Sequence, residues 1–142
     1  MRINLRTPCP CQSGQHYHQC CYALIEKRQA ARTAEQLMRS RYTAYHLKKI
    51  KYIAKTMRGP AKQGFNLQST QKWADQLSWQ SLNITRTVAG QPGDQQGWVA
   101  FEAVYLDGQQ QSHTIQEISV FYFENRWYYT EQIPDWSACP MA

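Results

Sequence analysis

Four of the five cysteines in this chain fall in one short stretch, "CPCQSGQHYHQCC". They form two close pairs, Cys9 with Cys11 and Cys20 with Cys21, joined by a loop whose Ser-Gly dipeptide signals a turn. A structural zinc site is closed by four sulfur or nitrogen ligands arranged as a tetrahedron. Adjacent side chains in the first turn of a helix lie about 100° apart, so Cys20 and Cys21 could both reach one ion. The spacing therefore predicts a single structural Zn²⁺ held by four thiolates.

The cysteine spacing leaves three alternatives open. A disulfide framework would leave one of the five thiols unpaired. A redox dithiol normally has two residues between its cysteines, a spacing that does not occur here. His16 or His18, in the loop, could replace one cysteine as a ligand.

The length and the hydrophobic content of the chain indicate which class of protein it belongs to. The 142 residues, 42% hydrophobic and 13% aromatic, suffice for one globular domain with a small appendage. No apolar stretch is long enough for a signal peptide, and the longest apolar run, "ISVFYF", is too short to cross a membrane. We therefore expect a cytoplasmic protein, in a compartment where clustered cysteines are more often metal ligands than disulfides.

The net charge of +6 suits acidic partners, but it is weak support for binding to nucleic acid. The basic segment "YHLKKIKYIAKTMR" carries its apolar residues at helical spacing. This spacing favours core packing with a solvated lysine face, so nucleic acid is not an expected partner.

The elements that must position the cysteines follow from periodicity. Thr33, with Gln36 three residues later, is a capping-box pattern that starts a long helix. The predicted helices span 19–30, 33–49, 49–57 and 69–79. Between the last two, a break containing Gly59 and Pro60 separates the patterns.

The second half of the chain changes to an alternating pattern typical of strands. Four predicted strands span 80–90, 97–108, 111–125 and 126–133. Helices followed by antiparallel strands indicate an α+β layer architecture. The closing segment, "PDWSACPMA", is predicted to be a loosely held tail.

The cysteine stretch resembles the SEC-C motif, the zinc-binding tail of the bacterial preprotein-translocase ATPase. Cys9, Cys11, Cys20 and Cys21 fall on its ligand positions, and Ser13, Gly14 and Tyr17 match as well. The chain departs from the motif at Gln12, where glycine is usual, and at His16 and His18, where lysines are usual. The resemblance implies one structural zinc ion with these four ligands.

The order of predicted elements resembles the nuclear-transport-factor-2-like cone fold, with about three helices on a curved, mainly antiparallel, four-stranded sheet. With the cysteine stretch, "TAEQLMRSRYTAY", "HTIQEISVF" and "RWYY", the chain resembles the YchJ family, in which a SEC-C knuckle precedes such a cone. The resemblance implies a zinc knuckle with a short helix over 1–30 and the cone domain over 31–142. Many YchJ-like proteins carry a second cysteine motif near the C-terminus. Here only Cys139 remains there, so a second zinc ion is not expected.

One predicted strand places a carboxylate among apolar side chains. Residues two apart share a strand face, so Ile115, Glu117, Ser119, Phe121 and Phe123 should point together, toward the helices. A buried Glu117 needs a partner, and Arg41, on the apolar face of the long helix, could form an ion pair with it. The alternative is that Glu117 acts as a general acid or base, as in cone-fold isomerases.

Tyr105, Tyr129 or Ser119 would then orient a ligand. The residues predicted to line the cavity are Arg41, Tyr105, Glu117, Ser119, Phe121 and Tyr129. His46 and His113 are expected at the surface or at strand ends.

These patterns favour a zinc-binding adaptor. Four thiolates leave no open coordination position for a catalytic water, so the zinc is expected to be structural. The SEC-C knuckle of the translocase binds a secretion chaperone and ribosomes, so the resemblance implies a ribosome or protein-export partner here. The alternative is a small-molecule binder or an isomerase- or hydrolase-like enzyme that uses the cavity around Glu117. The exposed sheet face of such cones often pairs, so a homodimer is also consistent with the resemblance.

Overall fold

The computed structural model describes residues 3–142, so the first two residues of the predicted knuckle lie outside the described part. The helical elements are η1 (Tyr17–Gln19), α1 (Cys21–Ile25), α2 (Ala34–His46), α3 (Ile50–Lys55), α4 (Pro60–Gln63), α5 (Leu67–Asp75) and the closing η2 (Trp136–Ala138). The strands are β1 (Ser78–Ala89), β2 (Gln96–Leu106), β3 (Ser112–Glu124) and β4 (Arg126–Ile133).

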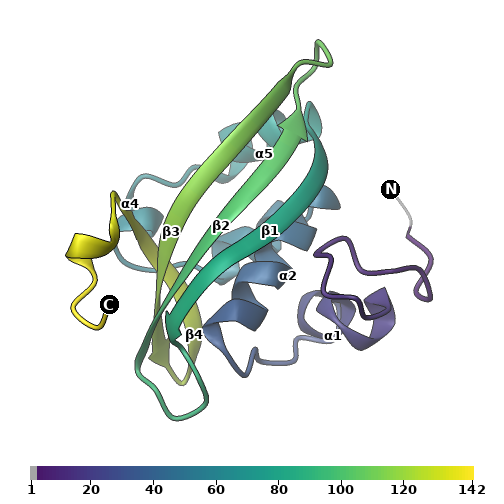
Figure 1. Cartoon of the computed structure of the whole chain (residues 1–142). Coiled ribbons are helices and arrows are strands. Elements are labelled where there is room, and N and C mark those ends of the chain that lie inside the picture. Colours follow the sequence, from purple (N-terminus) through teal and green to yellow (C-terminus); the bar gives the residue numbers. More distant parts are fainter. Residues whose placement is uncertain (1–2) are drawn as a thin grey trace.

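The four strands form one antiparallel sheet in the order β1-β2-β3-β4, which confirms the predicted α+β architecture. The long strands curve, and the helices α2 to α5 gather on one face, called here the inner face (Figure 1). Two register shifts in β1, between Trp79 and Ser81 and between Ile84 and Arg86, locally increase the bend of that edge strand. The result is a curved sheet that wraps around α2.

The capping of α2 follows the predicted pattern. The Thr33 hydroxyl oxygen accepts a hydrogen bond from the Gln36 N–H at 3.0 Å, and the Gln36 amide oxygen accepts from the Arg32 N–H at 2.6 Å. Leu37 and Met38 are buried in the main core cluster with residues of the inner sheet face, among them Phe121. The helix therefore starts at the predicted residue and packs by its apolar face.

The start of α2 is held against the turn between β1 and β2. The Ala34 N–H donates to the Gly90 carbonyl oxygen at 2.9 Å. A Cβ atom added at Gly97 would lie 2.6 Å from the Gly90 Cα and 2.9 Å from the Ala34 Cβ. Only a residue without a side chain fits at Gly97, so this contact fixes how α2 enters the sheet.

Three predicted helix boundaries are wrong. The helix predicted over 19–30 is confined to α1, Cys21–Ile25, and Arg28, with a φ angle of +57°, turns the chain out of the helical path. The helix predicted over 69–79 ends at Asp75. Lys48 Nζ donates hydrogen bonds to the Ala74 carbonyl oxygen in the last turn and to the Leu77 carbonyl oxygen just beyond it, so these carbonyl groups have a partner without a further helical turn. The predicted break after α3 contains one further helical turn, α4, with Pro60 at its first position.

The predicted loose tail is also wrong. Cys139 is only 5% exposed and packs with Trp98 and Val120 on the outer sheet face, opposite the helices. The Arg86 guanidinium lies 4.2 Å from the centre of the Trp136 ring. The tail is therefore anchored by apolar burial and a cation–π contact. Across residues 3–142, no helix has the length and apolar character needed to span a bilayer.

Candidate metal centre and neighbouring cavity

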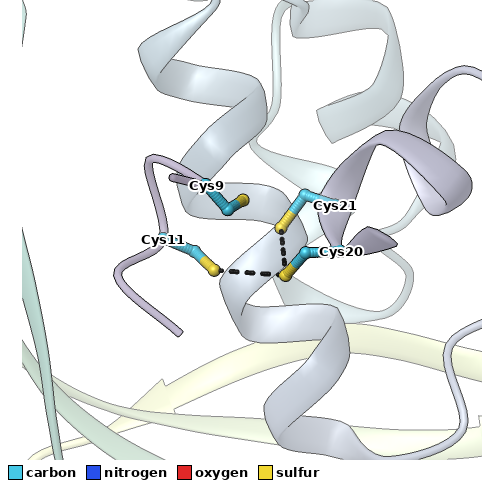
Figure 2. Close-up of side chains that lie close together, drawn as sticks. All are labelled: Cys9, Cys11, Cys20 and Cys21. Atoms are coloured by element: carbon cyan, nitrogen blue, oxygen red, sulfur yellow. Dashed lines mark hydrogen bonds between the residues drawn. The ribbon is translucent and has the colours of Figure 1, made fainter. Parts of the chain in front are cut away.

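The four predicted zinc ligands come together at one point of the knuckle (Figure 2). Cys9 and Cys11 lie on a tight loop, in which the Gln12 N–H donates to the Cys9 carbonyl oxygen at 3.0 Å. Cys20 and Cys21 lie where the chain enters α1, facing that loop. All four Sγ atoms lie within 4.8 Å of one another, and residues 3–142 contain no other cluster of three or more metal-binding side chains.

The sulfur spacing fits a tetrahedral zinc ion. Thiolates about 2.3 Å from a central zinc lie roughly 3.8 Å from one another at the corners of a tetrahedron. The Sγ atoms of Cys11 and Cys20 are 3.6 Å apart, and those of Cys20 and Cys21 are 3.9 Å apart. These separations far exceed the S–S bond length of about 2.05 Å. The geometry therefore favours a shared metal ion over a disulfide.

The surroundings of the thiols also suit a cation. Cys9, Cys11 and Cys21 are buried, and Cys20 is half-buried. Hydrogen bonds from Cys20, Cys21 and Cys9 lower the pKa of the Cys11 thiol. Hydrogen bonds with Cys11, Cys20 and Cys9, together with burial, raise the pKa of the Cys21 thiol. Four thiolates this close repel one another, so a divalent cation is needed to keep all of them ionised.

The two histidines of the loop are not part of the cysteine cluster. His18 Nδ1 is 2.8 Å from the Leu5 carbonyl oxygen, and the His18 N–H donates to the same oxygen at 2.9 Å. His16 pairs with Pro8 in an isolated β-bridge. Both histidines therefore shape the loop, and neither replaces a cysteine in this arrangement.

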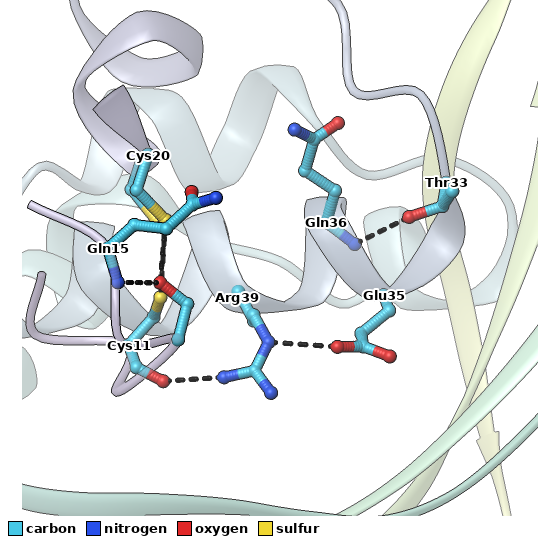
Figure 3. Close-up of polar contacts among 9 residues, drawn as sticks. Cys11, Gln15, Cys20, Thr33, Glu35, Gln36 and Arg39 are labelled. Atoms are coloured by element: carbon cyan, nitrogen blue, oxygen red, sulfur yellow. Dashed lines mark hydrogen bonds and ion pairs between the residues drawn. The ribbon is translucent and has the colours of Figure 1, made fainter. Parts of the chain in front are cut away.

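One arginine fastens the cysteine loop to the cone (Figure 3). Arg39 on α2 donates from Nη1 to the Cys11 carbonyl oxygen at 2.7 Å, and its Nε lies 3.0 Å from the Glu35 carboxylate. Thr43, one helical turn further along α2, places its Oγ1 3.8 Å from Cys9 Sγ. The knuckle is thus seated on α2, and its buried residues Cys9, Cys11, Tyr17 and Cys21 belong to the main core cluster.

Gln12 provides a second fastening that sequence reasoning missed. Its φ angle is +63°, in the left-handed region that glycine adopts most easily. Its amide oxygen accepts a hydrogen bond from the Leu82 N–H of β1 at 2.8 Å. A glycine here would suit the backbone and lose this contact with the sheet edge. The sequence marks Gln12 only as a departure from the SEC-C pattern, and that departure does not show which group the side chain contacts.

A cavity of about 240 Å³ lies between α2, α5 and the inner sheet face. Its lining residues are Met38, Arg41, Tyr42, Tyr45, Trp73, Trp79, Phe101, Ala103, Ile115, Glu117, Ser119 and Tyr129. Four of the six residues predicted to line a cavity are among them. Tyr105 and Phe121 are not: the Tyr105 ring packs on Trp79 at 5.0 Å, and Phe121 is fully buried beside Tyr129.

The predicted ion pair between Arg41 and Glu117 is not formed within the described chain. The Arg41 guanidinium instead donates to the Ile53 carbonyl oxygen at 2.9 Å and to the Thr56 hydroxyl at 2.7 Å. It also lies 4.8 Å from the centre of the Tyr129 ring. The carbonyl oxygen near the end of α3 and the face of the tyrosine ring stabilise the buried guanidinium charge, so Arg41 does not need a carboxylate partner.

Glu117 is half-buried and is held by two hydroxyl groups. Its carboxylate accepts hydrogen bonds from Ser119 Oγ at 2.5 Å and from the Tyr129 hydroxyl at 3.1 Å. Burial and the nearby negative charge of Glu117 raise the pKa of Tyr129, so this phenol stays protonated and keeps donating. The cavity therefore contains a fixed carboxylate beside aromatic walls.

The remaining predicted positions lie outside the cavity lining. Phe123 is 44% exposed and packs edge-on against Trp127, beyond the reach of the helices. His113 is exposed, and its Nε2 lies 2.7 Å from the Asp107 carboxylate at the hairpin end. His46 is half-buried at the end of α2, not at the surface, and burial lowers its pKa.

Comparison with known proteins agrees with this arrangement. Residues 7–23 match the family described as the SEC-C motif, and residues 33–132 match the family described as "YchJ, middle NTF2-like domain". A UPF0225 protein of Geobacter sulfurreducens is 38% identical over 125 residues, covering 87% of this chain and 76% of its own length. A UPF0225 protein of Haemophilus influenzae strain 86-028NP is 40% identical over 124 residues, covering 87% and 75%.

Two solved structures are also similar. A SEC-C motif containing protein from Rhodopseudomonas palustris has a TM-score of 0.79 and 30% identity, covering 89% of this chain and 98% of that protein. Another, from Psychrobacter arcticus, has a TM-score of 0.73 and 28% identity, covering 89% and 82%. The cysteine geometry, the cone and these matches agree: the chain belongs to the YchJ family, in which a SEC-C motif precedes a nuclear-transport-factor-2-like domain.

Proposed function

We propose that this protein is an adaptor whose four clustered cysteines hold one structural zinc ion. The observation that carries the zinc assignment is the sulfur spacing, with all four Sγ atoms within 4.8 Å of one another. In a reducing cytoplasm, where we place the protein, these thiols stay available to a metal. Four protein ligands close the shell, so the ion organises the chain and activates no water.

The adaptor role is supported by where the knuckle sits. Its inner side contacts α2 through Arg39 and Thr43, so the zinc site is held in a fixed position on the cone. Its outer loop, residues 12–16, is exposed, and Gln12 ties the start of this loop to β1. A rigid, exposed loop on a closed metal site is suited to protein contact. By analogy with the SEC-C motif, we propose a ribosomal or protein-export partner.

Native mass spectrometry of the purified full chain tests the zinc proposal. We expect one zinc ion per chain, released by a chelator, and the same spectrum reports whether the chain forms a homodimer. Alkylation of thiols under native conditions gives an independent measurement. Four thiols should become more reactive after chelation, because metal-bound thiolates are protected.

A metal-free mass, with the four clustered thiols reactive before any chelator is added, would contradict the zinc proposal.

For the adaptor role, the protein should co-sediment with ribosomes or bind an isolated export factor only while zinc is bound. Binding that survives complete zinc removal would show that the knuckle is not the contact surface.

A second candidate function rests on the cavity around Glu117. A carboxylate fixed by Ser119 and Tyr129 faces aromatic walls, an arrangement suited to a small apolar molecule that carries a hydrogen-bond donor. Trp79, another lining residue, has a buried Nε1–H with no hydrogen-bond partner within residues 3–142. This donor would be satisfied by an acceptor on such a ligand.

Glu117→Gln separates binding from structure. The amide oxygen of glutamine can still accept the Tyr129 hydrogen bond, so the free energy of unfolding should fall by only about 1 kcal/mol. A small molecule that the wild type retains in native mass spectrometry should be lost, because the carboxylate charge is gone. Glu102→Gln, on the outer face of β2, is the matched control and should leave retention unchanged. Equal retention by wild type and both variants would exclude Glu117 as a ligand contact.

A further inference from the structure

A groove of about 600 Å³, called here the basic groove, lies where the segment after the knuckle meets the cone. One wall is formed by the end of α1 and residues 26–31, and the other by α3 and the start of β4. It is separate from the cavity around Glu117 and shares no lining residue with it. Nothing in the zinc site or in the cavity uses this surface.

The groove is strongly basic. The cations that line it are Arg28, Lys48, Lys49, Lys51, Lys55 and Arg126, and its only acidic lining residue is Glu26. Two of the cations are already engaged: Lys49 pairs with Glu26 at 2.8 Å, and Lys48 satisfies carbonyl oxygens at the end of α5. The other four are exposed and form no ion pair within residues 3–142.

Because these four cations form no ion pair in the described part of the chain, an anionic ligand could pair with them without displacing an acidic side chain. Lys51 and Lys55 are four residues apart on α3, so they share one helix face. Arg126, at the start of β4, donates from Nη2 to the Arg28 carbonyl oxygen at 3.3 Å, so this hydrogen bond joins the two walls. The groove thus presents positive charge from both walls along its length.

The aromatic side chains of the groove argue against a nucleic acid. Base stacking requires free ring faces, and each ring here is engaged. Tyr52 packs against the buried core cluster that contains Ile53, and the Tyr128 ring is covered by Arg58 at 3.9 Å. Trp127 is 3% exposed. The remaining lining is largely aliphatic, from residues such as Ile25, Ala30 and Ala31, and it suits a peptide.

We propose that the basic groove binds an extended, acidic segment of a partner protein. The proposal rests on the adaptor function and names the chemistry of the partner. The lysines and arginines would pair with its carboxylates, and the aliphatic lining would accept its apolar side chains. A second copy of this chain is a poor occupant, because it carries 16 Lys and Arg residues against 10 Asp and Glu residues and so offers few carboxylates.

The wall formed by residues 26–31 depends on the knuckle. The Gln29 N–H donates to the Ala23 carbonyl oxygen at 3.0 Å, and Trp127 Nε1 donates to the Arg32 carbonyl oxygen at 3.3 Å. Arg28, between these ties, has a φ angle of +57°. The segment is therefore held at both ends, by α1 and by β4, and zinc binding should stabilise the groove through α1.

Fluorescence anisotropy with three labelled probes tests the proposal: a short peptide of alternating Glu and Leu, the same peptide with Gln in place of Glu, and single-stranded polyuridine. The zinc-loaded full chain should bind the Glu–Leu peptide at least about tenfold more tightly than the Gln–Leu peptide, with an affinity that falls as salt rises. The double variant Lys51→Glu/Lys55→Glu should weaken binding on the order of tenfold.

The matched control is Arg6→Glu/Lys72→Glu, which makes the same change in net charge at two exposed residues outside the groove. It should bind the Glu–Leu peptide within about twofold of wild type. The proposal is overturned if the groove variant binds as the control does, if the Gln–Leu peptide binds equally well, or if polyuridine binds and the Glu–Leu peptide does not. Zinc content, measured on each variant, separates the two proposals: peptide binding that fails in a protein with one zinc ion contradicts the groove alone.

Discussion

Replacing Cys20 with serine should abolish stable zinc binding and loosen the knuckle while the sheet stays folded. Serine keeps its proton at neutral pH, so the ion would lose one of four thiolates and its closed shell. Structural zinc contributes an apparent free energy of about 10–16 kcal/mol in small zinc peptides, so the apparent affinity should fall by more than about 100-fold. Chelator competition followed by native mass spectrometry measures this loss.

Hydrogen exchange should locate the structural effect of Cys20→Ser. The Cys9 N–H, which donates to the Gln15 carbonyl oxygen at 2.8 Å, should lose protection, whereas amides of β2 and β3 should keep it. Thermal stability should also fall, because Cys9, Cys11 and Tyr17 are part of the core cluster that contains Leu37. The knuckle is thus not a dispensable appendage of the cone.

Cys139→Ser is the control for this experiment. It makes the same exchange of thiol for hydroxyl at a buried cysteine, 5% exposed, outside the cluster. It should keep one zinc ion with unchanged affinity, although burying a hydroxyl beside Trp98 should lower stability somewhat. A Cys20→Ser protein that holds zinc as tightly as Cys139→Ser would contradict the four-thiolate site.

Arg41→Met should destabilise the cone by about 2–4 kcal/mol, because hydrogen bonds from a charged donor contribute roughly 1.5–3 kcal/mol each. Arg41 is 6% exposed, reaches from α2 to the Ile53 carbonyl oxygen at the end of α3, and places its guanidinium over the Tyr129 ring. Methionine fills part of the volume but supplies neither the hydrogen bonds nor the cation–π contact. Chemical denaturation of the zinc-loaded protein measures the change.

Arg58→Met is the matched control for Arg41. Arg58 also stacks on a tyrosine ring of β4, Tyr128, at 3.9 Å, but its side chain is 49% exposed and pairs with an exposed glutamate. Its loss should change the free energy of unfolding by less than about 1 kcal/mol. If Arg41→Met proves as mild as Arg58→Met, the buried guanidinium is not a structural group, and it would be available to a ligand in the cavity.

The connection between the knuckle and the groove gives the two proposals a common physical basis. A zinc ion held by Cys20 and Cys21 would fix α1, α1 positions residues 26–31, and that segment forms one wall of the basic groove. Arg39 and Gln12 tie the opposite side of the knuckle to α2 and β1. An adaptor of this kind would hold its partner between the metal-fixed segment and the cone, and metal loss would weaken the contact without unfolding the sheet.

The sequence by itself determined the features that depend on local spacing. The clustering of Cys9, Cys11, Cys20 and Cys21 could be predicted because a short loop can bring two such pairs together without help from distant residues. The start of α2 at Thr33 could be predicted because the capping contacts join residues within one turn. The four strands could be found because alternation is also a local pattern.

The tertiary structure decided which distant groups meet. Arg41 and Glu117 line the same cavity, but they do not pair with each other. Arg41 donates to the Ile53 carbonyl oxygen of α3, and Glu117 accepts from the Tyr129 hydroxyl. Periodicity gives the face on which a residue lies, but it does not give the distance to groups on other elements. The basic groove is likewise invisible in sequence, since its walls come from residues about a hundred positions apart, Arg28 and Arg126 among them. Ligand spacing is fixed by the covalent chain, whereas a cavity or groove is fixed by how its elements pack, and that depends on every contact in the core.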